Sequence, residues 1–236
     1  MNTQADSEQA RIIAWFDETY SNKGHRYLRP VKAYYVYLEL LDVKPGCHLL
    51  DVACGLGQLL LAAQEYGCQS FGTDISGTAI ATARESVPQA ALVRANAESL
   101  PYADSQFDRI TCIGSLERVL NARRALSEIR RVAKPNAQCC FLVRNSNTLT
   151  WKYLSGRPSD KRARGHQGAN TLQNWRELFK SSGFSILQIL PDQYPIHLWA
   201  QWSRLSLAKV DYRRPRRSCL PLNLANEFVF LLKRMN

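Results

Sequence analysis

Four residues, Asp51, Gly55, Gly57 and Asp74, have the types and the spacing to bind a ribose-containing ligand. Residues 48–53 form a mostly apolar run of strand length, and the two glycines after it lack a Cβ, so the backbone can turn sharply and approach a ligand closely. Asp74 ends the next apolar run, where a carboxylate can accept hydrogen bonds from both hydroxyls of a ribose. The spacing therefore predicts a nucleotide-like ligand at the carboxyl ends of parallel strands.

A nicotinamide dinucleotide is the obvious rival ligand, and the glycine spacing argues against it. The dinucleotide fingerprint needs a third glycine three positions after the second, and Leu60 occupies that position. The chain has instead an Asp51-x-Ala53-x-Gly55-x-Gly57 pattern, with an acid inside the strand. This pattern resembles motif I of the class I S-adenosylmethionine (SAM)-dependent methyltransferases.

Four further segments fall where that family would place them, and the resemblance extends over about residues 34–143. They are residues 72–84, 96–102, 107–110 and 128–135. The resemblance implies SAM as the cofactor and a set of cofactor-binding residues: Asp51, Ala53, Gly55, Gly57, Asp74, Ile75, Asn96, Ala97 and Gly114.

Three positions depart from the family pattern. Asn96 stands where the adenine loop usually has Asp, and its amide oxygen can still accept a hydrogen bond from the adenine amino group. Glu117-Arg118 replaces a frequent Glu-His pair, which removes one candidate base. In the turn before the fifth strand, Asn136 follows Pro135 in place of glycine, and asparagine tolerates a left-handed conformation.

The elements that must position these residues are those of an α/β, Rossmann-like class I methyltransferase fold. We expect a seven-stranded, mostly parallel sheet with helices on both faces and a C-terminal antiparallel strand. The strands are expected near residues 48–53, 70–74, 91–95, 108–113, 138–143, 184–190 and 225–232. Helices are expected at residues 11–20, 31–41, 58–66 and 120–133, with Ser76 as the N-cap of another.

All 236 residues are expected to form a single methyltransferase domain with additions. Residues 1–45 would be an N-terminal helical cap, and insertions at 145–170 and 191–224 would form a substrate lid, because loops of this length are usually functional or disordered. Tyr194 to Leu205 has the spacing of an amphipathic helix. It would cap an apolar acceptor, lie against a membrane, or simply pack onto the domain.

Positive charge is concentrated in the last third of the chain. Residues 1–150 carry 16 Lys/Arg and 15 Asp/Glu, whereas residues 151–236 carry 15 and 5. Two basic clusters, residues 157–164 and 213–217, would attract phosphate, anionic lipid or acidic substrates. Basic loops that serve only solubility are the alternative.

The sequence favours a cytoplasmic protein, with peripheral membrane contact as a further expectation. No apolar run reaches the length of a membrane-spanning helix, and the first residues lack the pattern of a secretory signal. Seven scattered cysteines without a CxxC pair indicate reduced thiols rather than a disulfide framework. A homodimer is compatible with the sequence.

Methyl transfer from a sulfonium is an in-line displacement that depends mainly on alignment and desolvation, and it needs no metal. A hydroxyl acceptor would also need a general base. Of four histidines we select His166, which lies in the first insertion on the expected acceptor side. Arg29 could meet the methionine carboxylate of the cofactor, although a surface role is the safer expectation.

Absent motifs narrow the acceptor. Residues 113–116 lack the Asn/Asp-Pro-Pro-Tyr of amino-methylating nucleic-acid enzymes, and no Pro-Cys nucleophile for cytosine C5 is present. The sequence is most similar to quinone, natural-product and glycan methyltransferases, so we expect a small-molecule, lipid-like or glycan acceptor that is anionic. Two alternatives stay open: an RNA methyltransferase that grips phosphates with the basic tail, although nucleic acid is the less expected partner, and a SAM-binding protein without catalysis.

Overall fold

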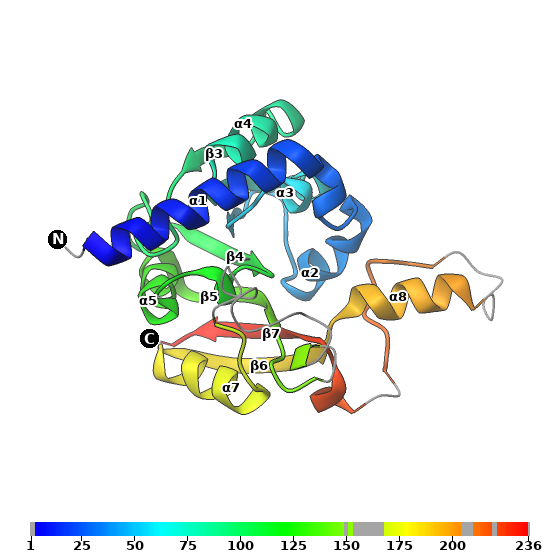
Figure 1. The fold of residues 1–236 in the computed structure, drawn as a ribbon. Helices are drawn as coiled ribbons and strands as arrows, with labels where there is room; N and C mark the ends of the chain where they lie inside the picture. The colour runs from blue at the N-terminus through cyan, green and yellow to red at the C-terminus, as the bar shows by residue number, and fades with distance from the viewer. Residues whose placement is uncertain (1–2, 149–150, 153–167, 204–209, 219–220, 236) are drawn as a thin grey trace.

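A seven-stranded sheet with helices on both faces forms the centre of the molecule (Figure 1). This computed structural model describes residues 3–148, 151–152, 168–203, 210–218 and 221–235. The strands are β1 (His48–Val52), β2 (Gln69–Asp74), β3 (Ala91–Arg94), β4 (Phe107–Ile113), β5 (Ala133–Arg144), β6 (Phe184–Pro191) and β7 (Glu227–Arg234). The α-helices are α1 (Thr3–Lys23), α2 (Tyr35–Leu40), α3 (Gln58–Ala63), α4 (Gly77–Ser86), α5 (Ala122–Val132), α7 (Leu172–Ser181) and α8 (Gln193–Trp202).

The strand order is β3-β2-β1-β4-β5-β7-β6. Strands β1 to β5 pair in parallel, and β7 lies antiparallel between β5 and β6. The predicted fold class is therefore confirmed. Because β7 runs against its neighbours, its first residue, Glu227, lies at the same edge of the sheet as the carboxyl ends of β1 and β4.

Two apolar cores hold the helices against the sheet. On one face, α5 and α7 contribute Leu126, Ile129, Trp175 and Phe179 to a fully buried cluster with side chains of β4, β5 and β7. On the other face, residues of α2, α3 and α4 pack against β1 and β5. A domain with buried parallel strands needs both faces covered in this way, because the strands are apolar on both sides.

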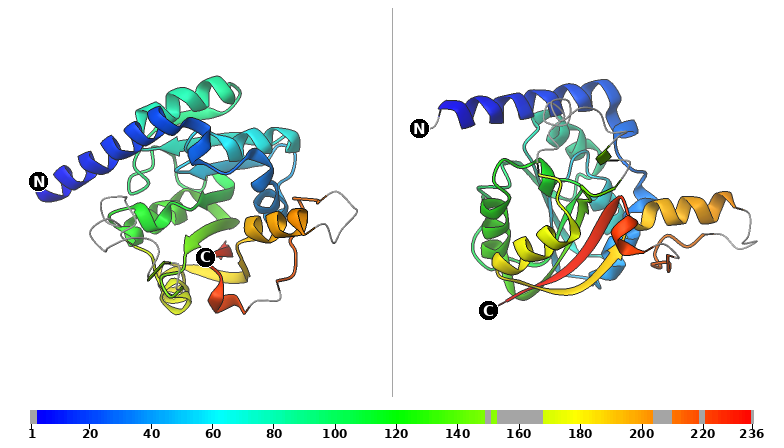
Figure 2. Two further views of the ribbon diagram at one scale, coloured as in Figure 1. Left: turned by 45° about the vertical axis from the view of Figure 1, so that its right-hand side comes forward. Right: turned by 60° about the horizontal axis from the view of Figure 1, so that its bottom comes forward.

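A third, smaller apolar cluster fixes α1 over the carboxyl ends of β1 and β2, where Ile12, Phe16 and Tyr20 meet Leu56 and Ala79 (Figures 1 and 2). This helix is longer than the expected one. The sequence did not predict its first turns, because the residues there are polar and show no apolar periodicity. The expected helix at residues 31–41 is instead a short 3-10 turn, η2 (Val31–Ala33), followed by α2. Another 3-10 turn, η1 (Gly24–Tyr27), follows α1 directly.

The predicted features at Ser76 and Asn136 are present, and Gly67 adds a left-handed residue after the third helix. The Ser76 hydroxyl accepts a hydrogen bond from the Ala79 N–H at 3.0 Å and caps α4. After α3 and the 3-10 turn η3 (Gln64–Tyr66), Gly67 has a φ of +63°. Asn136 has a φ of +66° within β5, the left-handed conformation that its amide side chain was expected to allow.

Helix α8, which lies between β6 and β7 in the chain, projects from the main body of the domain (Figures 1 and 2). Two more 3-10 turns, η4 (Leu116–Arg118) and η6 (Leu222–Leu224), follow β4 and precede β7. Within the described residues, no helix combines the length and the apolar character needed to cross a membrane.

Candidate active site

The glycine turn after β1 has the strained backbone that its residue types predicted. Ala53, Gly55 and Gly57 all have positive φ values, of +59°, +53° and +84°. A Cβ on Gly55 would lie 3.1 Å from the Tyr20 hydroxyl oxygen and 3.3 Å from Leu28 Cδ1. The turn therefore brings the backbone close to the N-terminal segment, and a side chain at position 55 would require Tyr20 and Leu28 to shift.

Two buried carboxylates lie at the ends of β1 and β2. Asp74 accepts hydrogen bonds from the N–H groups of Gly55 at 2.8 Å and Ser76 at 2.9 Å. Asp51 accepts one from the Thr111 hydroxyl at 2.6 Å. Burial raises the pKa of Asp51 to about 7 and that of Asp74 to about 6, since it penalises the charged forms. A bound hydrogen-bond donor or cation would therefore stabilise the ionised form of both carboxylates.

Two adjoining cavities open beside these carboxylates, and they divide most of the predicted cofactor residues between them. The Asn96 cavity, of about 60 Å³, is lined by Ala53, Asp74, Ile75, Asn96 and Ala97 among others. The Arg29 cavity, of about 340 Å³, is lined by Arg29, Asp51, Ala53, Gly55 and Gly114 among others. The two cavities share the aromatic side chains of Phe16 and Tyr20 in their walls.

Two predicted residues fall elsewhere. Gly57 lines neither cavity: it begins α3, and a Cβ there would lie 3.1 Å from Val87 Cγ2 and 3.3 Å from Ala83 Cβ. Its role in the structure is to let α3 start close against α4. His166, the predicted base, lies outside the described residues.

Helix α1 supplies the wall that both cavities share. Phe16 and Tyr20 line both of them, with ring centroids 5.9 Å apart. Asp17, on the same helix, accepts hydrogen bonds from the Ser76 hydroxyl at 2.5 Å and the Thr78 N–H at 3.1 Å. Burial opposes ionisation of Asp17, but these hydrogen bonds hold its pKa below the ordinary value. A charged contact thus fastens α1 to the start of α4, over the site.

The amide of Asn96 is already engaged in two hydrogen bonds. Its oxygen accepts from the Glu98 N–H at 2.9 Å, and its nitrogen donates to the Gln9 side chain of α1 at 3.1 Å. The side chain therefore shapes the loop and ties it to α1. Its oxygen retains a second lone pair with which it can accept from an adenine amino group.

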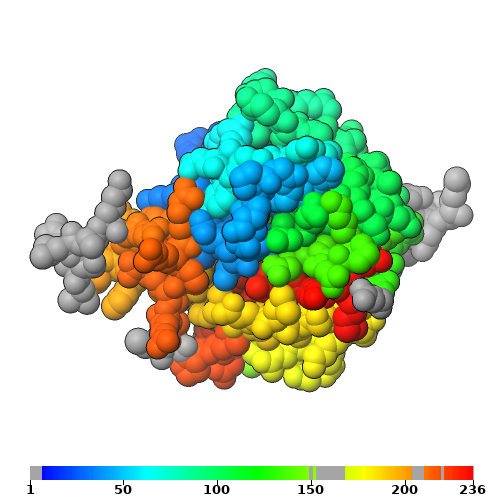
Figure 3. All heavy atoms as spheres, turned by 180° about the vertical axis from the view of Figure 1, so that it is seen from behind, coloured from blue at the N-terminus to red at the C-terminus, as the bar shows by residue number. Residues whose placement is uncertain are grey.

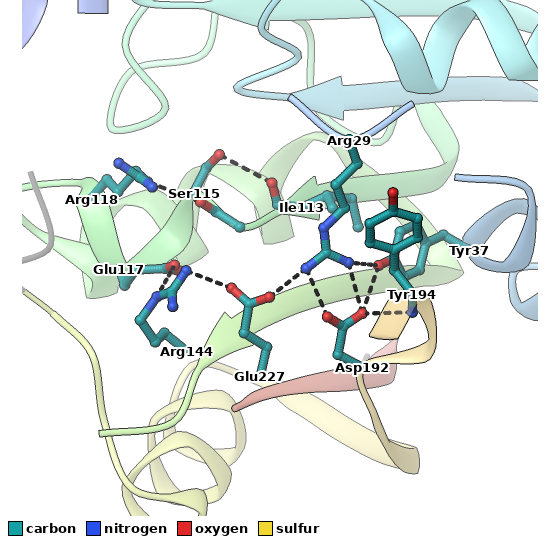
Figure 4. A network of polar contacts seen from close by, with 11 residues as sticks. Arg29, Tyr37, Ile113, Ser115, Glu117, Arg118, Arg144, Asp192, Tyr194 and Glu227 are labelled. Carbon is teal, nitrogen blue, oxygen red and sulfur yellow. Dashed lines mark hydrogen bonds and ion pairs between the residues drawn. The ribbon is translucent and has the colours of Figure 1, made fainter. Parts of the chain in front are cut away.

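A chain of five alternating charges crosses the far wall of the Arg29 cavity (Figure 4). Arg29 donates to both oxygens of Asp192 at 2.7 Å and to Glu227 at 2.5 Å. Glu227 also accepts from Arg144 at 2.8 Å, and Arg144 lies 3.9 Å from Glu117. The expected surface role for Arg29 is wrong: its side chain is only 21% exposed, because two carboxylates hold it inside.

Glu117 is the unusual member of this chain. Its side chain is fully buried, and neither carboxylate oxygen has a hydrogen-bond partner. Burial raises its pKa, and Arg118 and Arg144 only partly oppose the rise. The Arg144 guanidinium, at 3.9 Å, lies beyond hydrogen-bond distance, so burial keeps the pKa of this carboxyl above its ordinary value.

The three histidines in the described part of the chain lie outside both cavities. His48 contacts the Gln106 carbonyl at 3.2 Å, as a structural residue would, and the exposed His25 contacts Gln58 at 2.6 Å. His197 is buried against the Arg214 carbonyl at 3.1 Å. None of them is placed to act on a molecule in the Arg29 cavity.

The first basic cluster, residues 157–164, lies outside the described residues, whereas Arg213 of the second cluster makes contacts within the domain. Arg213 donates to Glu65 at 2.5 Å and to the Tyr66 hydroxyl at 2.8 Å, and its guanidinium lies 4.3 Å from the centroid of the Tyr35 ring. It therefore clamps residues 210–218 to the α2–α3 side of the domain (Figure 3).

Sequence reasoning missed the acidic half of the charge chain. Asp192 and Glu227 are two of only five acids in residues 151–236, and each flanks an apolar strand. An acid at a strand end in an otherwise basic segment was the available signal. Phe16, Asp17 and Arg144 gave no comparable signal, because their roles depend on contacts with distant segments.

Comparison with known proteins agrees with this geometry. A family model described as "Methyltransferase domain" matches residues 50–141. The chain is 39% identical over 114 residues to a 2-phytyl-1,4-naphtoquinone methyltransferase of Trichormus variabilis, covering 44% of this chain and 50% of that protein. It is 37% identical over 120 residues to a demethylmenaquinone methyltransferase of Shouchella clausii, covering 48% and 51%.

The chain thus spans about half the length of the curated relatives it matches. Among solved structures, an S-adenosylmethionine-dependent methyltransferase from Mesorhizobium loti superposes with a TM-score of 0.65 at 18% identity, over 86% of this chain and 98% of that one. The sequence match, the strand order and the Asp51–Gly57 turn beside Asp74 agree: residues 50–141 match the methyltransferase domain family, and the chain has the fold of class I SAM-dependent methyltransferases.

Proposed function

We propose that this protein binds SAM and transfers its methyl group to a small, lipid-like acceptor of the quinol type. The observation that carries the cofactor assignment is the pair of buried carboxylates, Asp51 and Asp74, beside a glycine turn that a Cβ would obstruct. When bound, SAM supplies a methyl group carried on a sulfonium. A cationic, ribose-bearing ligand fits a site with two buried acids and an aromatic wall.

The residues divide into three roles under this proposal. Asp74 accepts the ribose hydroxyls, and Ile75, Asn96 and Ala97 enclose the adenine. The turn at residues 53–57, with Gly114 opposite, holds the remainder of the cofactor close to the backbone. Residues 1–45 act as the cap, because Phe16 and Tyr20 cover both cavities.

The acceptor belongs in the Arg29 cavity, which is the larger of the two adjoining volumes. Quinone acceptors are named for the curated relatives at 39% and 37% identity, and this supports a naphthoquinol-type ring. Arg29 and Arg144 face carboxylates, so they do not by themselves call for an anionic acceptor. The expected anionic character would come from the ionised quinol oxygen, which makes the ring nucleophilic.

Transfer of the methyl group to a ring carbon must be followed by loss of that carbon's proton. His166 is proposed as the base that takes it, and the insertions at 145–170 and 191–224 are proposed as the lid that excludes water. His166 and most of the first insertion lie outside the described residues, and the described residues of the second insertion line neither cavity.

The first test is calorimetric titration with SAM and, separately, with NAD. We expect micromolar affinity for SAM and no heat with NAD. The second test is incubation with methyl-labelled SAM and a soluble 1,4-naphthoquinol, with RNA and a neutral glycan as competing acceptors. Label in the quinol supports the proposal. Salt-sensitive label in RNA would favour an RNA methyltransferase, and SAM binding without label in any acceptor would favour a non-catalytic role.

A further inference from the structure

Helix α8 exposes its largest apolar side chains to solvent. Leu198, Trp199 and Trp202 are 41%, 63% and 84% exposed, although they lie within one turn of each other on the helix. In an ordinary surface helix such residues face the core. Here the buried side chains of α8 are Gln193 and His197, so the polar side of the helix faces the protein and the apolar side faces solvent.

Specific contacts hold α8 in this orientation. The Asp192 side chain caps its first turn by accepting from the Tyr194 N–H at 3.2 Å, while the same carboxylate binds Arg29. The Gln193 side chain accepts from the Arg216 N–H at 2.7 Å. Farther along, the His197 ring lies 4.9 Å from that of Tyr212. The polar side of α8 is thus fastened to the segment at residues 210–218.

That segment is itself fixed to the α2–α3 side of the domain by the Arg213 clamp (Figure 3), so α8, which contacts it, has a defined place. The clamp also brings positive charge close to α8, since the Arg214 carbonyl oxygen lies 3.1 Å from the His197 ring. Residues 210–218 contain four arginines and a single acid, Asp211. Arg214, which pairs with Asp211 at 3.3 Å, has a side chain that is 88% exposed, and Arg217 is exposed as well.

We propose that α8 and residues 210–218 form a docking surface for an anionic lipid bilayer. Indole rings favour the boundary between headgroups and acyl chains, because one edge is apolar and the N–H is polar. The exposed arginines of residues 210–218 add attraction to negatively charged headgroups. Docking in this way needs neither SAM nor catalysis, so it goes beyond the methyl-transfer proposal and is tested separately from it.

Charge complementarity favours a bilayer over a second copy of this chain. In a twofold dimer through α8, the same patch would meet itself, and Arg214 and Arg217 of the two copies would approach each other. Such like charges weaken a protein interface. An anionic membrane instead neutralises them.

The test measures binding of the full chain to vesicles by co-sedimentation, without SAM. One set of vesicles is pure phosphatidylcholine, and the other contains about one third phosphatidylglycerol. We expect binding to the anionic set that weakens with added salt, as for any electrostatically assisted contact. The double variant Trp199→Ala/Trp202→Ala is expected to lose about tenfold in partitioning, since two indoles no longer bury apolar area.

Arg214→Gln/Arg217→Gln should lose a similar factor on anionic vesicles only. Its matched control is Lys44→Gln/Lys180→Gln, which removes two exposed positive charges elsewhere and should bind like the parent chain. Leu187→Ala, which shortens an exposed apolar side chain on β6, is the control for the tryptophans. Circular dichroism of each variant confirms that the fold is retained.

Three results would overturn the proposal. The first is that the folded parent chain does not bind anionic vesicles. The second is that the control variants lose as much binding as the α8 variants. Sedimentation equilibrium without lipid could instead show a dimer that Trp199→Ala/Trp202→Ala dissolves, and the face would then be a subunit interface.

Discussion

Arg29 and Asp192 form a bidentate ion pair in which both nitrogen–oxygen distances are 2.7 Å. The pair joins the segment after α1 to the N-cap of α8, and its arginine lines the larger cavity. It therefore connects the N-terminal cap of the site to the base of the proposed membrane surface. The geometry is the planar fork that lysine cannot reproduce.

Removing one partner of this pair should be costly. Arg29→Ala leaves the buried Asp192 without a guanidinium and Glu227 with Arg144 alone, and we expect a loss of about 3 kcal/mol in the free energy of unfolding. Denaturant unfolding measures it. Arg29→Lys should recover only part of the loss, because it keeps the charge without the fork. Equal stability of Arg29→Ala and the parent chain would show that the pair is not formed in solution.

Asp74→Ala should weaken SAM binding by about 1.5–3 kcal/mol, because the ribose would lose its charged acceptor. The structure adds a second reason: the carboxylate also accepts from the Gly55 and Ser76 N–H groups and so shapes the turn. Calorimetric titration measures the change, with Asp104→Ala, an exposed acid, as the matched control. Unchanged affinity in Asp74→Ala would place the ribose elsewhere.

The affinity for SAM should rise with pH between about 5 and 8. Asp74 and Asp51 have pKa values of about 6 and 7, so both are largely protonated at the lower end and ionised at the upper end. The ionised forms attract a sulfonium and accept ribose hydrogen bonds, so we expect roughly a tenfold gain in affinity. The neutral thioether S-adenosylhomocysteine should show a shallower slope. A flat profile for both ligands would contradict this assignment.

The same two groups should make the ligand-free protein less stable as pH rises. Their folded pKa values exceed the ordinary value of 3.8, so the stabilising contribution is complete below that value and is lost as pH rises through about 6 to 7. Asp51→Asn should remove part of this dependence. Thermal unfolding of both chains from pH 4 to 8 checks it, and parallel curves would count against the raised pKa of Asp51.

Glu117→Gln should change stability little at low pH and should increase it, relative to the parent chain, as pH rises. The reason is that burial raises the pKa of this carboxyl, so ionising it in the folded state costs free energy that glutamine does not incur. Denaturant unfolding at several pH values measures the difference. A parent chain that is more stable than Glu117→Gln at high pH would mean that Arg144 pairs with an ionised Glu117.

The sheet and the glycine turn were predictable because their signals are local. Buried parallel strands appear as apolar runs, and the turn needs glycines at fixed positions, so residues 48–113 could be assigned from the sequence. The Arg29–Asp192 pair could not, since a charged residue carries no mark of a partner 163 positions away. For α8, the periodicity predicted an amphipathic helix but could not tell which side faces the domain. Contacts from residues 210–218 decide that.

The separation of Arg29 from Asp192 also has a consequence for how the molecule is made. At the usual 5–20 residues per second, a ribosome needs roughly 10–30 s to go from one to the other. During that interval the glycine turn and its strand neighbours have been synthesised, whereas the carboxylates that hold Arg29 have not. The nascent chain thus contains the glycine turn well before it contains the carboxylates that hold Arg29 in the wall of the Arg29 cavity. Translation therefore produces the glycine turn first and the carboxylates that hold Arg29 later.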